Sequence, residues 1–271
     1  MGNETENRPI AIEREWLDAA LSTIHENSEG LFSSGLFITL VGYGVPGDGL
    51  PDDLRHHLVL LLRGLWTTET IVARLEWERG LWLNDVMNDA QWMDFAAADI
   101  TLFHVQVRCV FDCLAQVISR VSHVPKQAPR RSFADLRRRV NKHPDPSSEA
   151  LGDDLRLEVF NCDWFDDLRT VRDSIVHQGA TPIVFLGKPR ILFQVEVGVK
   201  DSISIPEIMS DEKLVDFELY AGLHVGYLIA YLERVSGLVS ELRGFRLAGS
   251  SGRSFHPGLG VVRDWIRRVA Q

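Results

Sequence analysis

The sequence predicts a mainly α-helical protein with one small β-hairpin. Apolar residues recur at three- and four-residue spacing over several long stretches, the longest from about Trp92 to Val121. Two short runs rich in β-branched and apolar residues flank a Gly-Lys-Pro-Arg turn at 187–190, which is typical of a hairpin. With 271 residues, 45% of them hydrophobic and 25% charged, the chain has the composition of an ordinary globular protein with a substantial core.

Four regions are expected along the chain. Residues 1–9 are polar and are predicted to form a disordered tail. Residues 10–50 combine an amphipathic helix, ending at about residue 26, with a glycine-rich loop. Residues 51–242 hold the helical bundle, and residues 243–271 form a basic tail with a short helix at Val261–Val269.

The bundle region divides into elements by the same patterns. They are helices at Asp52–Leu65, Thr68–Trp82, about Trp92–Val121 and roughly Trp164–His177, a hairpin of Pro182–Leu186 with Ile191–Val199, and a last long helix at Glu212–Leu242. Residues 122–154 contain four prolines and are predicted to be a long loop with one short helix, Ser132–Val140. A mostly helical bundle with a β-hairpin before its last long helix is therefore expected.

No metal or cofactor site is expected from the motifs. Cys109 and Cys113 are four residues apart in an apolar helix and are predicted to be small buried side chains. The adjacent histidines His56 and His57 point to different faces of a helix, which is unfavourable for a shared metal. The G-x-G-x-x-G pattern at 42–47 continues into further loop instead of opening a helix, so a dinucleotide site is not predicted.

The segment 168–179, LRTVRDSIVHQG, holds the chemically most informative residues. Arg172 supplies a permanent charge suited to a phosphate, and His177 can move protons at neutral pH. On an ideal helix the two point about 140° apart, so they are expected to converge only if the helix ends near Val176. Gly179 is the expected C-terminal cap. Asp173 shares a helix face with His177 and could orient its ring.

This segment resembles the HEPN superfamily, whose mark is an arginine, a polar residue and a histidine a few residues further on, in a helical bundle. Arg172, Asp173 and His177 fall on these three positions, and the resemblance extends over about residues 52–242. It implies a metal-independent endoribonuclease without a cofactor. Arg172 would bind the phosphate and His177 would act as base or acid, with Asp173 orienting the ring. The resemblance further implies a homodimer, because one histidine cannot easily perform both proton transfers.

Further residues are candidates for supporting roles. Arg169 lies one turn before Asp173 and could orient its carboxylate. Arg108 and Asp112 form part of a polar row on the 92–121 helix, which is either a solvated face or a group packed near His177. Residues 126–142 contain seven Lys or Arg against one acid, and the RNA-binding candidates there are Arg130, Arg131, Arg137, Arg138 and Arg139. Alternatively, this basic stretch neutralises the acidic residues of 145–167.

Two rival functions are open at this point. One is a catalytically inactive HEPN-like scaffold that binds a protein antitoxin or a defence-complex partner, which the net charge of −9 and the exposed hairpin edge favour. The other is an unrelated helical enzyme with its site elsewhere. The chain opens with no signal peptide, and the apolar run Leu58–Leu62 is too short to span a bilayer. A cytoplasmic protein without a membrane partner is therefore expected.

Overall fold

The computed structural model describes residues 12–24, 52–122, 132–195, 208–209, 214–243 and 258–271. These residues form a mainly helical structure with one small antiparallel sheet, as predicted. The predicted N-terminal tail, the glycine-rich loop at 42–47, and Arg130 and Arg131 lie outside the described residues.

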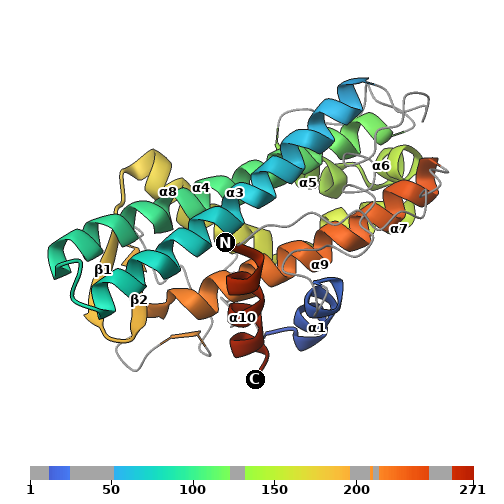
Figure 1. Ribbon diagram of the computed structural model, residues 1–271. Helices are drawn as coiled ribbons and strands as arrows, with labels where there is room; N and C mark the ends of the chain where they lie inside the picture. The colour runs from blue at the N-terminus through green and yellow to red at the C-terminus, as the bar shows by residue number, and fades with distance from the viewer. Residues whose placement is uncertain (1–11, 25–51, 123–131, 196–207, 210–213, 244–257) are drawn as a thin grey trace.

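Two long helices run along the length of the molecule, α3 (Asp52–Leu83) and α4 (Asp89–Val121) (Figure 1). The prediction of two helices in place of α3 is wrong, because its threonines do not start a new helix. The hydroxyls of Thr67 and Thr70 instead donate to carbonyls four residues earlier in the same helix. Gly64 lets α4 come close, since a Cβ there would meet Val110 Cγ2 at 2.9 Å.

Residues 133–160 form three short helices, α5 (Phe133–Lys142), α6 (Pro144–Leu151) and α7 (Asp153–Phe160). The predicted long loop at 122–154 is therefore wrong from residue 133 onwards, apart from the short helix expected within it. Pro144 occupies the first turn of α6, where the backbone N–H that proline lacks would have no helical partner. The short helix expected at Ser132–Val140 is confirmed, and Ser132 caps it by accepting from the backbone N–H of Asp135 at 3.2 Å.

The sheet has the order β1-β2-β3, with β1 (Pro182–Gly187), β2 (Arg190–Val195) and β3 (Val215–Asp216). The hairpin is confirmed, with Val184 opposite Phe193, and residues 196–199 of its predicted second strand lie outside the described residues. The last long helix, α9 (Phe217–Arg243), begins later than predicted. Asp216 ends β3 and caps α9, because its Oδ1 accepts from the backbone N–H of Glu218 at 3.0 Å.

Helix α9 is the centre of the packing. Both α1 (Arg14–Thr23) and α10 (Gly258–Ala270) lie against it. Gly222 allows the approach of α10, since a Cβ there would meet the Trp265 backbone carbonyl at 2.7 Å. Trp265 is itself fully buried, so the C-terminal helix, longer than the predicted Val261–Val269, belongs to the core packing.

Two histidines are part of this core, between α4 and α9. His104 Nδ1 lies 2.7 Å from the Ile100 carbonyl, so this nitrogen carries the proton, and Nε2 accepts from the Tyr220 hydroxyl at 3.0 Å. The ring of His224 lies 4.3 Å from that of Tyr220, centroid to centroid. Burial lowers the pKa of His104 to about 4 and that of His224 to about 3, so both rings are neutral at pH 7.

Candidate functional site

Helix α8 (Trp164–Gln178) carries the motif and packs with one face against α4. Phe165, Leu168 and Val171 are buried on that face, which fixes the helix along its length. Gly179 ends the helix in the left-handed conformation, with φ of 70°, and its N–H donates to the Ser174 carbonyl. The predicted helix and its glycine cap are therefore confirmed.

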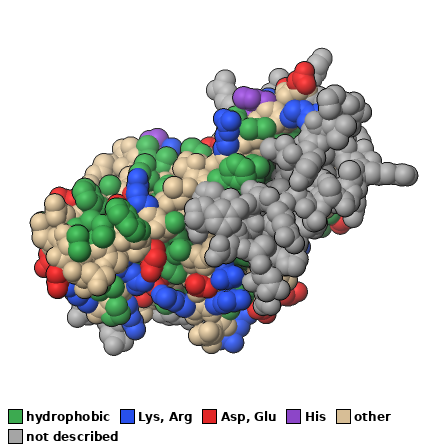
Figure 2. Space-filling view, viewed as in Figure 1, with side chains coloured by type: hydrophobic (Ala, Val, Ile, Leu, Met, Phe, Trp, Pro, Cys, Tyr) green, Lys and Arg blue, Asp and Glu red, His purple; other side chains and the backbone are tan. Residues whose placement is uncertain are grey.

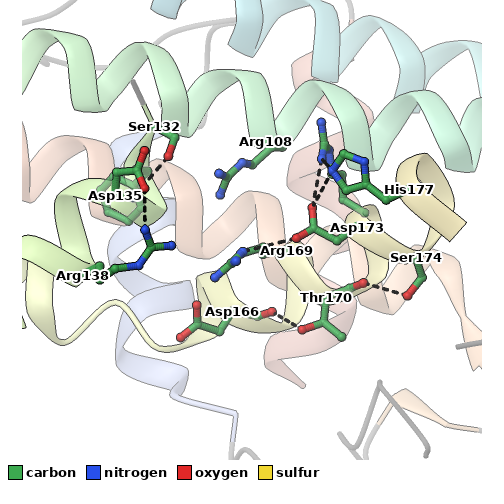
Figure 3. A network of polar contacts seen from close by, with 12 residues as sticks. Arg108, Ser132, Asp135, Arg138, Asp166, Arg169, Thr170, Asp173, Ser174 and His177 are labelled. Carbon is green, nitrogen blue, oxygen red and sulfur yellow. Dashed lines mark hydrogen bonds and ion pairs between the residues drawn. The ribbon is translucent and has the colours of Figure 1, made fainter. Parts of the chain in front are cut away.

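Arg172 joins the other two residues of the motif. Its Nη1 lies 2.9 Å from Asp173 Oδ1 and 3.0 Å from His177 Nε2 (Figure 3). The expectation that this contact requires the helix to end near Val176 is wrong, since α8 continues to Gln178. The arginine side chain is long enough to reach around the helix to the imidazole.

This contact fixes the tautomer of His177 when its ring is neutral. An arginine N–H can only donate, so Nε2 accepts and the proton sits on Nδ1. Asp173 does not orient the ring as expected, because its Oδ1 lies 4.0 Å from His177 Nε2, beyond hydrogen-bond distance. Asp173 instead holds two arginines, since its Oδ2 also lies 3.3 Å from Arg169 Nε. The predicted pairing of Arg169 with Asp173 is thus present.

The motif is open to solvent. The side chain of His177 is 66% exposed and that of Asp173 is 35% exposed. Its surroundings are positively charged, because Arg169 and Arg172 share the single carboxylate of Asp173. An exposed imidazole beside two arginines can bind an oxyanion and exchange a proton with it.

Arg108 of α4 lies beneath this cluster. Its guanidinium carbon is 4.8 Å from the centre of the Phe165 ring of α8, and its Nη2 is 3.4 Å from Asp112 Oδ1. Burial lowers the pKa of Arg108, with smaller contributions from Arg169 and Arg172 nearby. Helix α4 thus brings Arg108 close to the motif arginines, whereas the alternative considered from the sequence placed it near His177.

Asp112 has a structural partner as well. Its Oδ1 accepts from the backbone N–H of Phe133 at 3.0 Å, which ties the start of α5 to α4. Burial raises the pKa of its carboxyl, against the opposing effect of Arg108. Asp112 therefore pairs with Arg108 and also interacts electrostatically with Arg172 of the motif.

Cys109 is a neighbour of the site that sequence reasoning misplaced. It is exposed, so the prediction of a buried side chain is wrong, whereas Cys113 is half-buried. Partial burial and Asp112 raise the pKa of the Cys109 thiol, and the nearby Arg172 opposes this. Its position two turns after the exposed Leu102 is the signal that places it on the outer face of α4.

The arginines of α5 have different partners. Arg137 donates to Asp166 Oδ2 at 2.6 Å, to Asp163 Oδ1 at 2.7 Å and to the Phe160 carbonyl at 3.0 Å. For Arg137, the structure therefore supports the alternative that the basic stretch neutralises the acidic residues of 145–167. Arg138 pairs only within its own helix, with Asp135 at 2.9 Å, and is exposed. Arg139 has no ion pair with any other described residue.

In the part of the chain that the structure describes, no group of three or more His, Cys, Asp or Glu side chains could hold a metal ion. Among the described helices, α4 alone is long and apolar enough to cross a membrane, by length and composition only. It packs here against α3, α8 and α9, as the core helix of a globular fold does. Comparison with protein-family models, curated proteins and solved structures finds no match.

Proposed function

We propose that this protein is a metal-independent endoribonuclease of the HEPN type, acting in phage defence or as the toxin of a toxin–antitoxin pair in the cytoplasm. One observation carries the proposal. A single arginine, Arg172, contacts both the carboxylate of Asp173 and Nε2 of His177 at the solvent-exposed end of α8. A phosphate-binding group and a proton-transfer group are thus in contact with each other at the end of one helix.

The geometry suggests how substrate binding would activate the base. In the free protein, the Nε2 lone pair of His177 accepts from Arg172 Nη1 and is occupied. A phosphate that draws the guanidinium onto its non-bridging oxygens would release this lone pair. His177 would then take the proton of the ribose 2′-OH while the 2′ oxygen attacks phosphorus.

The reaction would expel the 5′ oxygen and yield a 2′,3′-cyclic phosphate and a 5′-OH end. Arg172 would stabilise the charge that builds on the phosphate oxygens, and Arg108 beneath it has a buried Nη1 with no hydrogen-bond partner among the described residues. The leaving oxygen needs a proton from a second group. In this proposal it comes from His177 of a second copy.

A homodimer with the motif helices near the two-fold axis would provide that group. An exposed apolar side chain within the motif helix, Val176, favours such an interface. We expect the two His177 rings to lie within roughly 12 Å of each other, so that both reach one phosphate. A monomer in solution, measured by light scattering, or a dimer with the two motifs on opposite outer faces would contradict this mechanism.

Cleavage of a fluorescent RNA in the presence of EDTA tests the proposal. His177→Ala should lower the rate by about 10²–10⁴-fold, because it removes the proton-transfer group. Arg172→Lys should also fail, since an ammonium cannot reproduce the planar contact with a phosphate. His56→Ala and Arg63→Lys, on the exposed face of α3, are matched controls that should keep full activity.

A specific observation favours a second function, that of a catalytically inactive scaffold. Strand β1 is the edge of the sheet, and its Ile183 and Leu186 are exposed. Figure 2 also shows hydrophobic side chains gathered at the end of the molecule where α3 and α4 meet, the region of the exposed Trp77 and Val86. If the folded wild-type protein cleaves no RNA at any concentration, this second function replaces the first.

A further inference from the structure

A cavity of about 440 Å³ lies where α3, the β1–β2 turn, β3, the start of α9 and the end of α10 meet. It shares no residue with the motif end of α8. Its charged lining consists of Arg79, Arg190, Arg268, Asp216 and Glu218. Three guanidinium groups from three separate elements thus face one cavity together with two carboxylates.

Most of these charges stabilise the fold. The carboxylate of Glu218, only 6% exposed, is held between Arg79 on one oxygen and Arg268 on the other. Arg79 also contacts Glu76 at 2.5 Å and donates to the Pro189 carbonyl at 3.0 Å, which fixes the turn between β1 and β2. The arrangement of Arg79, Glu218 and Arg268 is therefore complete without any further charge.

Arg190 is not needed by this arrangement. Its side chain is 64% exposed, and its Nε lies 3.9 Å from Asp216 Oδ2, beyond hydrogen-bond distance. The other oxygen of Asp216 caps α9. Arg268 is 49% exposed and gives only Nη1 to Glu218, which holds the guanidinium in place while leaving further donors.

We propose that this cavity binds a small organic anion, whose single oxyanion group is held by Arg190 and Arg268 and whose apolar body lies against Ile208 and Leu219. Guanidinium groups bind carboxylates and phosphates through paired N–H donors, and Arg268 is already ordered by Glu218. The cavity has the volume of a site for a small molecule. Asp216 and Glu218 repel a second negative group, which excludes polyanions such as RNA.

Two probes distinguish the two classes of oxyanion, benzoate for carboxylates and phenyl phosphate for phosphate esters. Each is added to the full-length protein at about 10 mM, and the unfolding temperature and the binding heat are measured. We expect at least one of them to raise the unfolding temperature. Phenol, which lacks the anion, and inorganic phosphate, which lacks the apolar body, should have much smaller effects.

Arg190→Gln should weaken binding of the effective probe by at least about tenfold while leaving the unfolding temperature of the free protein unchanged. Arg63→Gln, an exposed arginine on α3 far from the cavity, is the matched control and should bind as the wild type does. Failure of both probes, or equal binding by these two variants, would overturn the proposal. RNA cleavage is not measured here, so the outcome is separate from that of the proposed ribonuclease.

Discussion

Two clusters of arginine and carboxylate groups, one at the end of α8 and one at the start of α9, use the same side chains in different environments. At α8, Asp173 forms ion pairs with Arg169 and Arg172, and its side chain is about one-third exposed. At α9, Glu218 forms ion pairs with Arg79 and Arg268, and its side chain is almost completely buried. The first carboxylate keeps water within reach, whereas the second is enclosed by the fold.

This difference separates a cluster that can change partners from one that cannot. Exposed ion pairs contribute little to stability and exchange readily with an incoming anion. A buried carboxylate between two guanidinium groups has no alternative partner, so its loss leaves uncompensated charge inside the protein. Function is therefore expected at α8 and stability at Glu218 of α9, with the partly exposed Arg190 and Arg268 as the groups of that region that can still bind a ligand.

Removing the two carboxylates is the strongest test of this contrast. Glu218→Ala should lower the free energy of unfolding by about 3–5 kcal/mol, because Arg79 and Arg268 lose their shared partner. Asp173→Ala should cost less than about 1 kcal/mol, since its arginines remain solvated. Urea denaturation of both variants measures these values, and equal losses would contradict the distinction.

The two buried histidines of the core make the stability of the protein depend on pH. Unfolded His104 and His224 bind protons below about pH 6.5, but in the folded protein their pKa values are about 4 and about 3. The stability that they contribute is fully present above pH 6.5 and is lost as the pH falls from 6.5 towards 4. His224→Phe should reduce this loss, measured by urea denaturation at several pH values.

His224 is a favourable position for this substitution, since neither ring nitrogen has a hydrogen-bond partner among the described residues. The wild-type protein, measured over the same pH range, is the control. A His224→Phe variant that loses stability on acidification as steeply as the wild type would show that these buried rings do not drive acid unfolding.

What the sequence predicted correctly depends on local interactions. The span of α8, its cap at Gly179 and the hairpin all follow from residues close together in the chain. The errors arise where a local signal has two physical outcomes. Proline is typical of a loop but Pro144 opens α6, and threonine is typical of a helix start but the threonines near residue 67 lie inside α3.

The α9 cluster could not be predicted at all. Its members lie at positions 79, 218 and 268, on separate elements that only the folded chain brings together. No spacing rule connects them, whereas Arg172, Asp173 and His177 lie within two turns of one helix. The contact of Arg172 with His177 could not be predicted either, because ideal helix geometry places their Cβ atoms far apart and only the extended arginine side chain joins them.

Asp167, on the same helix as Asp173, offers a pH-dependent effect. Burial, together with Asp166 and Asp163, raises the pKa of Asp167 to about 7, far above its usual 3.8. The folded protein therefore holds a proton there that the unfolded chain has released, so this contribution to stability is lost as the pH rises from about 4 to 7. Asp167→Asn should increase stability at pH 8 and have little effect at pH 4, and a loss of stability at pH 8 would contradict this.

The smallest predicted effects concern two arginines of α5. They distinguish a guanidinium that pairs with other elements of the fold from one that is available to a ligand. Arg137 is nearly buried and connects α5 to the start of α8. Arg137→Gln should therefore lower the free energy of unfolding by about 1 kcal/mol. It should leave the salt dependence of RNA binding unchanged. Arg138 is exposed, so Arg138→Gln should cost only a few tenths of a kcal/mol. If it contacts a phosphate, it should also lower the log–log salt slope by about 0.7.

Fluorescence anisotropy with a 2′-deoxy oligonucleotide, which cannot be cleaved by 2′-OH attack, measures this slope without interference from catalysis. An Arg137→Gln variant with a reduced slope would show that its partners Asp163 and Asp166 do not hold it away from RNA. An unchanged slope for Arg138→Gln would remove the exposed face of α5 from the substrate path. RNA binding would then depend on the α8 cluster and not on Arg138, because Arg169 and Arg172 share one carboxylate and retain charge for a phosphate.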